Sequence, residues 1–230
     1  MISFFVFGGA RDALAKDSMP GARPALFGLG SGRLVFGAAI AFFLAGTAPS
    51  FAAEPLPILP RTDWGAKAPS MLMSPQVPTH VTFHHSAAKQ RPGKSAASKM
   101  LSLQRFSQSS EKLADGRTKK AWADVPYHFY IAADGTVAEG RDVSFAGDTN
   151  TDYDPSGHIS IVLEGNFENE LPGEAQIEAA ISLGHLMVAA YQIDAANFGY
   201  HQHHASTACP GANFVKVWPL VRERILAGGG

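Results

Sequence analysis

Short runs of β-forming residues alternate with longer amphipathic segments, and this alternation constrains the fold more than any other feature of the sequence. The runs expected to be strands cover residues 80–84, 127–132, 136–138 and 159–163. The segments with helical spacing cover residues 94–113, 174–191 and 213–226. Strands interleaved with helices predict an α/β fold in which helices flank a sheet. We therefore expect a single domain over residues 61–227.

The sharpest local prediction is a hairpin at Asp134-Gly135. An Asp-Gly pair tolerates the positive φ angles of a tight type I′ turn, so residues 127–132 and 136–138 should pair as antiparallel strands. Because the other strands are separated by helical segments, the central sheet is expected to be mixed. Gly116 is expected to stop the first helix, and Pro219 to kink or divide the last one.

Residues 1–53 are expected to be a secretory signal peptide. A continuous apolar run, Leu34–Gly46, is followed by small residues up to Ala53, the pattern that a signal peptidase recognises. The run is shorter than the ~20 apolar residues of a membrane span, so we expect no stable membrane insertion after signal removal. Met19 is a possible translation start. The exported chain, periplasmic or secreted, would begin with a proline-rich linker over residues 54–60.

Composition and charge narrow the classes of partner. An apolar fraction of 46% with 17% charged residues is typical of a globular protein, and a net charge of -1 gives no reason to expect a nucleic-acid partner. The single cysteine, Cys209, can form no internal disulfide in an exported chain. Its thiol is therefore buried and free, paired with another molecule, or a metal ligand.

The histidines favour the metal-ligand interpretation of Cys209 because they cluster. Five of the nine lie in two groups, His84-His85 at a strand end and His201, His203 and His204 shortly before the cysteine. Two imidazole nitrogens and one thiolate are a known ligand set for catalytic zinc, with water in the fourth position. Adjacent side chains on a strand face opposite ways, so only one histidine of the first pair can reach a given metal.

Four segments carry a resemblance to a known family. They are Arg61-Thr-Asp-Trp-Gly-Ala; Val81-Thr-Phe-His-His-Ser-Ala; Val125-Pro-Tyr-His-Phe-Tyr-Ile with Asp134-Gly-Thr-Val and Gly140-Arg141; and His201 followed after seven residues by Cys209-Pro-Gly. In order and spacing these segments resemble the type 2 N-acetylmuramoyl-L-alanine amidases. This zinc-dependent family includes phage lysozyme-type amidases and the peptidoglycan recognition proteins. The resemblance spans roughly residues 61–226.

The resemblance implies a site and an activity. It makes His84, His201 and Cys209 the ligands of Zn²⁺, in a groove at the edge of the sheet, and gives Tyr127 a catalytic place. The implied reaction is hydrolysis of the amide bond between N-acetylmuramic acid and L-alanine in peptidoglycan, with peptidoglycan or muropeptides as partners. A tyrosine there can donate a hydrogen bond to the oxyanion of an acyl-transfer intermediate. The competing interpretation of Tyr127 is a strand aromatic that fills the core.

The chain departs from the family pattern at several positions. Thr207 lies where phage enzymes carry a catalytic lysine and recognition proteins commonly carry threonine, which implies an auxiliary catalytic role for its hydroxyl. The stretch Ala146-Gly147-Asp148-Thr149 lacks the histidine often found just after Ala-Gly in this family. His203 and His204 replace residues that are not usually histidine, and either could compete for the metal or tune it from outside the ligand set.

Two other classes compete with the enzyme. Some peptidoglycan recognition proteins keep the fold and bind peptidoglycan without cutting it, and those members characteristically lose the cysteine ligand. Because Cys209 is present together with both histidines and Tyr127, the sequence favours a hydrolase over a non-catalytic binding module. A purely structural zinc site is disfavoured because such sites usually close all four positions with protein ligands.

Overall fold

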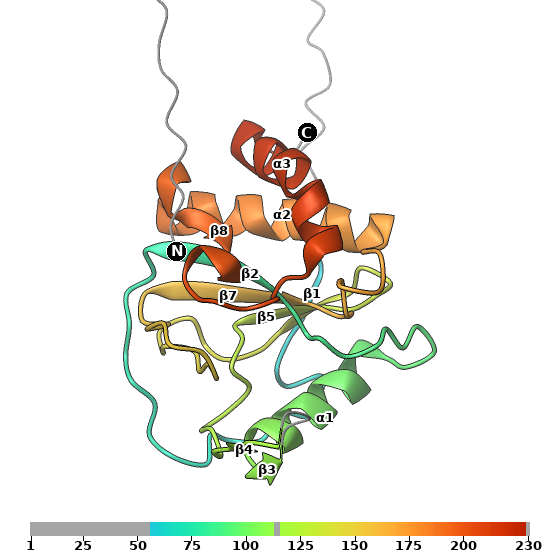
Figure 1. Cartoon of the computed structure of the whole chain (residues 1–230). Coiled ribbons are helices and arrows are strands. Elements are labelled where there is room, and N and C mark those ends of the chain that lie inside the picture. Colours follow the sequence, from blue (N-terminus) through green and yellow to red (C-terminus); the bar gives the residue numbers. More distant parts are fainter. Residues whose placement is uncertain (1–55, 113–115, 229–230) are drawn as a thin grey trace, which may run out of the picture. The chain divides into compact units, whose positions relative to one another are not determined.

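The computed structural model describes residues 56–112 and 116–228, so the expected signal peptide lies outside the described residues. A six-stranded sheet forms the centre of the domain, in the order β1-β6-β5-β7-β2-β8 (Figure 1). Its strands are β1 (Ile58–Leu59), β2 (His80–His85), β5 (Phe129–Ile131), β6 (Val137–Glu139), β7 (His158–Leu163) and β8 (Phe198–Tyr200). Strands β5 and β6 are antiparallel and the other pairs are parallel, which confirms the expected mixed sheet.

Helices cover both faces of this sheet. They are α1 (Ala96–Ser107), α2 (Glu174–Tyr191) and α3 (Ala212–Ala227), with short 3₁₀ turns η1 (Ala195–Asn197) and η2 (His201–His203). Helices α2 and α3 lie together on one face, and α1 lies on the other (Figure 1). A separate two-stranded ribbon joins β3 (Glu111–Lys112) to β4 (Thr118–Lys119). No helix in the described part of the chain is long and apolar enough to span a bilayer.

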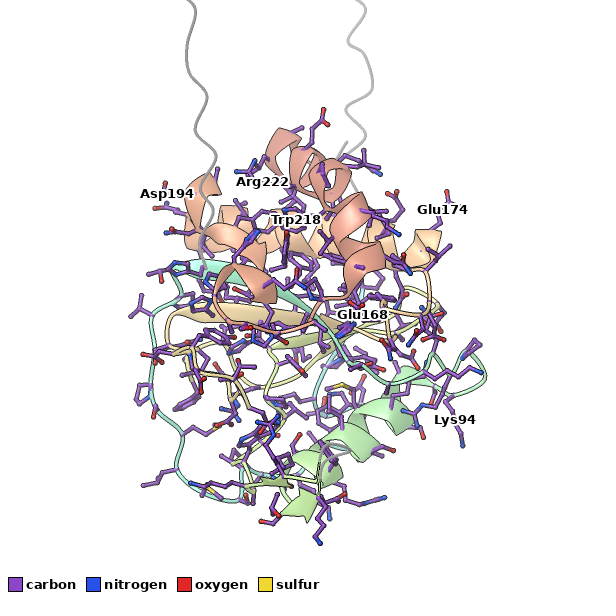
Figure 2. All side chains as sticks on the ribbon, viewed as in Figure 1. Lys94, Glu168, Glu174, Asp194, Trp218 and Arg222 are labelled. Atoms are coloured by element: carbon purple, nitrogen blue, oxygen red, sulfur yellow. The ribbon has the colours of Figure 1, made fainter. Side chains whose placement is uncertain are left out.

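The two faces of the sheet build two apolar clusters. Val81 and Phe83 of β2 pack with α2 and α3, where Trp218 points from α3 toward the sheet (Figure 2). On the opposite face Val162 of β7 packs with Met100 of α1. Both faces of the central strands are therefore covered, which explains why their sequences are near-continuous apolar runs rather than alternating ones.

The hairpin forms as expected, but its turn is not the type I′ turn that the Asp-Gly pair predicts. Of the two residues only Gly135 has a positive φ, +84°. The Gly135 N–H donates to the Ala132 carbonyl, and the Asp134 carboxylate accepts from the Thr136 N–H. This is a type I turn followed by a left-handed glycine, the three-residue hairpin loop. The glycine is also required sterically, because a Cβ there would lie 2.7 Å from the Ala175 carbonyl oxygen.

Helix α1 ends earlier than the sequence predicts, at Ser107 instead of near Gly116. The serine-rich segment that follows supplies hydroxyls that compete with helical hydrogen bonds, and the Ser109 hydroxyl donates to the Phe106 carbonyl. The buried ammonium of Lys119 then binds the carbonyls of Ser107 and Ser109. These contacts turn the chain into the β3–β4 ribbon.

Two further expectations are corrected in part. Pro219 was expected to kink or divide the last helix, and division does not occur, since α3 runs through it from Ala212 to Ala227. Its apolar neighbours Trp218 and Val221 are buried against the core, and this packing offsets the hydrogen bond that proline cannot make. Part of the segment expected to be a linker also belongs to the sheet, because Ile58–Leu59 pair in parallel with β6 at its edge.

Candidate metal centre

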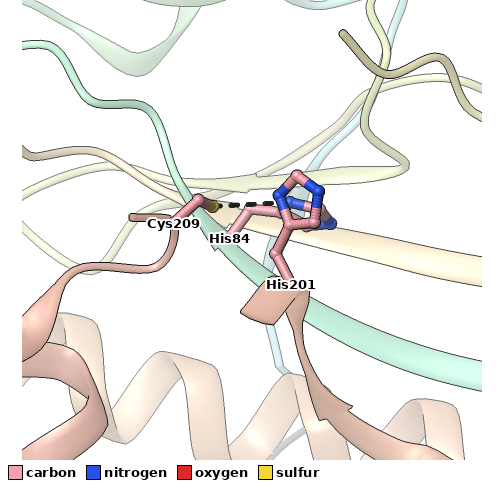
Figure 3. Close-up of side chains that lie close together, drawn as sticks. All are labelled: His84, His201 and Cys209. Carbon is pink, nitrogen blue, oxygen red and sulfur yellow. Dashed lines mark hydrogen bonds between the residues drawn. The ribbon is translucent and has the colours of Figure 1, made fainter. Parts of the chain in front are cut away.

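Three of the residues singled out by the sequence lie together beside the ends of β2 and β8. One possible ligand atom from each of His84, His201 and Cys209 lies within 4.8 Å of the others, and Figure 3 shows the three side chains converging. No fourth histidine, cysteine or acidic residue in the described ranges joins this group. His84 Nδ1 is 3.6 Å from Cys209 Sγ. Two ligand atoms at ~2.0 and ~2.3 Å from one tetrahedral ion are about 3.6 Å apart, so this spacing fits zinc.

Strand β2 separates the two adjacent histidines. The His85 ring lies against Phe167, with Val81 and Phe83 on the side of the sheet that α2 and α3 cover, and its Nδ1 accepts from the Phe167 N–H at 3.2 Å. His84 faces the opposite side and contacts Tyr127, with ring centroids 5.3 Å apart. Burial lowers the pKa of His85 to about 4, so its ring stays neutral and keeps this acceptor. Only His84 of the pair reaches the cluster.

The second segment places one of its three histidines in the cluster. Strand β8 ends at Tyr200 and η2 begins at His201, which turns the buried His201 ring toward His84 at a centroid distance of 4.7 Å. His203 lies against the ring of Tyr200, 3.8 Å between centroids, and is exposed. His204 packs against His158 at 4.7 Å. Neither of these two belongs to the group of converging ligand atoms.

The Cys209 loop is held by hydrogen bonds on both sides of the sulfur. The Thr207 hydroxyl accepts from the Cys209 N–H at 3.2 Å, and the Gly211 N–H donates to the Ala208 carbonyl at 2.6 Å. Gly211 has φ +92°, and a Cβ there would lie 2.5 Å from the carbonyl carbon of Phe167. A turn therefore directly follows the cysteine, and it needs glycine at position 211.

Burial sets the protonation of the cluster. It lowers the pKa of His84 well below the ordinary value, with His201 the next cause, and it lowers that of His201 to about 4. Burial also raises the pKa of Cys209 to about 12, opposed by the His85 backbone N–H. Both imidazoles are therefore neutral at physiological pH, the form that binds metals, and a metal must displace the thiol proton.

An unpaired nitrogen provides a second, independent indication of a metal. His201 Nδ1 is a buried side-chain atom without a hydrogen-bond partner among the described residues. His84 Nε2 is also unpaired, but in that ring it is the other nitrogen, Nδ1, that faces the sulfur. Leaving a buried polar atom unpaired costs ~1–3 kcal/mol, so such atoms are uncommon and usually have a functional explanation. The donor set and its spacing fit a zinc ion held by one nitrogen of each histidine and by the thiolate.

A pocket of about 290 Å³ opens over this cluster. Its lining includes the three candidate ligands, Thr207, Tyr127 and the segment Asp148–Thr151. Burial raises the pKa of Tyr127 far above its ordinary value, with Cys209 and Tyr153 adding to the effect. The phenol therefore remains a hydrogen-bond donor at all physiological pH values.

Tyr127 is positioned by the motif that follows the hairpin. Its carbonyl accepts from the Arg141 N–H at 2.8 Å, and a Cβ at Gly140 would lie 2.2 Å from the same oxygen. The Arg141 guanidinium is buried and binds the carbonyls of Val125 and Ala146. The Gly140-Arg141 pair thus packs the segment before β5, which carries Tyr127, against the loop that lines the pocket.

Sequence reasoning missed several contacts of the pocket. The Thr151 hydroxyl lies 2.8 Å from His201 Nε2, the backbone N–H of His85 points at the cysteine sulfur, and Asp148 forms an ion pair with Arg141. Asp148 stands in the segment that lacks the family histidine. The spacing of residues in the sequence does not predict these contacts, because they join residues that are 7 to 124 positions apart.

The fold and the site together define an α/β domain with a pocket at the ends of its parallel strands, where three possible metal ligands converge. Residues 74–212, more than half of the chain, match the family described as N-acetylmuramoyl-L-alanine amidase. The chain belongs to the N-acetylmuramoyl-L-alanine amidase family.

Individual relatives agree with this assignment. The N-acetylmuramoyl-L-alanine amidase of Sus scrofa is 33% identical over 175 residues, which cover 70% of this chain and 27% of the pig protein. Peptidoglycan-recognition protein SD of Drosophila simulans is 28% identical over 181 residues, 74% of this chain and 90% of that protein. These relatives and the family support a peptidoglycan-related function.

Solved structures share the fold. The Drosophila peptidoglycan recognition proteins SD and LB superpose with TM-scores of 0.61 and 0.58 at 26% and 30% identity, covering 71% of this chain and 95% and 94% of theirs. The amidase LysC from Clostridium intestinale has a TM-score of 0.57 at 22% identity, covering 74% of this chain and 97% of LysC. A mutant of protein LB, also 30% identical, has been solved in complex with tracheal cytotoxin.

Proposed function

We propose that this protein is a zinc-dependent amidase that hydrolyses the bond between N-acetylmuramic acid and L-alanine in peptidoglycan or in muropeptides. The observation that carries the proposal is the convergence of His84, His201 and Cys209 within 4.8 Å at a pocket that Tyr127 also lines. Three protein ligands leave a coordination position for reacting groups, whereas structural zinc sites close all four with protein.

The chain's residues have distinct tasks in this proposal. Bound zinc supplies Lewis acidity, which polarises the scissile carbonyl and lowers the pKa of water toward neutrality. Tyr127, protonated because burial raises its pKa, donates a hydrogen bond to the carbonyl oxygen as negative charge develops on it. Thr207 has the auxiliary role: its hydroxyl accepts from the Cys209 N–H and so orients the sulfur, but it brings no positive charge to the pocket.

The test is digestion of purified muropeptides by three preparations of the protein: zinc-loaded, chelator-treated, and chelator-treated with zinc restored. We expect mass spectrometry to find a free stem peptide beginning with L-alanine only in the first and third preparations. Cys209→Ser is the inactive variant, and His203→Ala, in the same segment but outside the cluster, is its matched control.

The competing function is a peptidoglycan-binding module without catalysis. A zinc-loaded protein that binds muropeptides and leaves every bond intact would establish that function and overturn the amidase proposal. Cleavage at another bond, or cleavage that survives complete zinc removal, would overturn it as well.

We also propose that the protein acts after export, because peptidoglycan lies outside the cytoplasm and the apolar run Leu34–Gly46 precedes small residues. N-terminal sequencing of the protein from its producing cells tests this, with a first residue next to Ala52 or Ala53 as the expected result. A chain that retains Leu34–Gly46 would contradict signal cleavage and indicate a retained anchor.

A further inference from the structure

A short chain of hydroxyls ends on one of the candidate ligands. Thr151 Oγ1 lies 2.8 Å from His201 Nε2, and Thr149 Oγ1 lies 2.8 Å from Thr151 Oγ1. The Thr151 backbone N–H also donates to Thr149 Oγ1, at 3.1 Å, which closes a tight turn around the pair. Both threonines belong to the segment Asp148–Thr151, which lines the pocket over the metal cluster.

The pattern of partners assigns a direction to these hydrogen bonds. His201 Nδ1 is the unpaired nitrogen of the ring, and Nε2 is the nitrogen that faces Thr151. A neutral imidazole that offers Nδ1 to a metal carries its proton on Nε2. Nε2–H therefore donates to Thr151 Oγ1, and the Thr151 hydroxyl is left to donate to Thr149 Oγ1.

Two aromatic rings lie against His201. The ring lies against Tyr153, with centroids 5.0 Å apart, and against His84 on the metal side. Because His201 is buried, its Nε2–H would remain unpaired if Thr151 were removed. The hydroxyl thus decides both the tautomer and the rotation of the ring.

We propose that Thr151 is a positioning residue of the metal centre, which holds His201 in the tautomer and orientation that binds zinc, with Thr149 completing the relay. This inference rests on the metal site of the proposed function. It adds that the loop 148–151, which departs from the family pattern at Asp148, is an integral part of that site. Groups that orient a metal-binding histidine typically contribute 10- to 100-fold to metal affinity.

The test measures the zinc affinity of the purified parent and of two Thr151 variants, in competition with a chromophoric chelator. Thr151→Val keeps the shape of the side chain and removes its hydroxyl, and we expect it to bind zinc about 10- to 100-fold more weakly. Thr151→Ser restores the hydroxyl, and we expect it to return affinity to within a few-fold of the parent.

The chain offers a matched control in Thr82→Val. The Thr82 hydroxyl is also 2.8 Å from a ring nitrogen, that of His158, but this histidine is outside the metal cluster. We expect Thr82→Val to change thermal stability and to leave zinc affinity unchanged. Absorption spectra of the cobalt-substituted proteins give a readout that does not depend on turnover, with altered ligand-field bands expected for Thr151→Val alone.

The outcomes separate this inference from the proposed function. If Thr151→Val binds zinc as tightly as the parent and its cobalt spectrum is unchanged, Thr151 has no positioning role, whatever the amidase assay shows. An equal loss of affinity in Thr82→Val would also overturn the inference, because it would reduce the effect to general destabilisation. A parent protein that binds zinc tightly but cleaves no muropeptide would overturn the proposed function and leave the role of Thr151 standing.

Discussion

The backbone N–H of His85 donates to the sulfur of Cys209 across 3.4 Å. Strand β2 therefore contributes twice to the cluster, through the side chain of His84 and through the amide of the next residue. A hydrogen bond to sulfur favours the thiolate, and it opposes the burial that raises the pKa of this cysteine to about 12. This hydrogen bond joins the end of β2 to the loop before α3 without requiring a metal.

Substitutions should divide the histidines and the cysteine into two groups. We expect His84→Ala, His201→Ala and Cys209→Ala to lose both zinc and muropeptide cleavage, because a three-ligand site cannot spare a ligand. We expect the proteins with alanine at His85, His203 or His204 to retain most of their zinc. Elemental analysis after dialysis, with circular dichroism as the folding control, checks this. An empty site in His203→Ala together with a filled one in His201→Ala would invert the assignment of the second segment.

Removing the phenolic hydroxyl of Tyr127 should affect turnover and not metal binding. We expect Tyr127→Phe to lower kcat about 10²- to 10³-fold with zinc retained, the typical effect of losing one oxyanion donor. Tyr200→Phe, on β8 and absent from the lining of the pocket, is the matched control. Near-normal turnover of Tyr127→Phe at full zinc occupancy would make Tyr127 a packing residue.

His128 should make the fold sensitive to acid. Its Nδ1 accepts from the Ser160 N–H and its Nε2 donates to the Phe145 carbonyl, each at 2.9 Å, and burial lowers its pKa to about 4. The unfolded chain, with a histidine pKa near 6.5, takes up this proton first. The free energy of unfolding should therefore be highest above pH 6.5 and fall by about 3 kcal/mol toward pH 4 on account of His128 alone.

Urea unfolding of the metal-free protein between pH 7 and pH 4 measures this loss of stability. His128→Gln can keep both hydrogen bonds without titrating, so its stability should decline less steeply with falling pH than that of the parent. Identical pH profiles for the two proteins would show that His128 contributes nothing to the acid sensitivity.

Two neighbouring lysines should differ sharply in their contribution to stability. The ammonium of Lys119 is buried and donates to the carbonyls of Ser107, Ser109 and Lys120, whereas the Lys120 side chain is exposed. We expect Lys119→Met to reduce the free energy of unfolding by about 2–4 kcal/mol, because three carbonyls lose their donor. Lys120→Met should stay within about 0.5 kcal/mol of the parent. Equal effects in thermal unfolding would refute this difference.

The centre of the fold could be predicted from local patterns because its three helices and the strands β2 and β7 are its longest elements. Helix α2 has the bounds 174–191 that its apolar spacing predicts, and β2 and β7 each differ from prediction by one residue. Short elements escaped prediction: the edge strands β1 and β8 have two and three residues, too few for a period to show. Their existence depends on hydrogen bonds to β6 and β2, which the sequence does not display.

Prediction of the site had a similar limit. Because adjacent side chains on a strand face opposite ways, only one residue of the His84-His85 pair can belong to the metal cluster. The family resemblance then selected His84, His201 and Cys209. Thr151 carries no such signal, since a threonine in a polar loop is ordinary until the fold brings it within 2.8 Å of His201. The type of turn at Asp134-Gly135 was predicted wrongly for a related reason. The pair is compatible with two loop types, and the flanking strands decide between them.

Cleavage of a purified muropeptide by the zinc-loaded protein in ¹⁸O-labelled water tests the central claim most directly. Hydrolysis of the amide between N-acetylmuramic acid and L-alanine places one labelled oxygen in the lactyl carboxylate of the sugar and leaves the peptide with an unlabelled amino terminus. Mass spectrometry should find the label in the sugar product, in amounts that follow zinc occupancy. An intact muropeptide at full zinc occupancy would contradict the assignment of this chain as an N-acetylmuramoyl-L-alanine amidase. So would a label in a carboxylate formed by cleavage of any other bond.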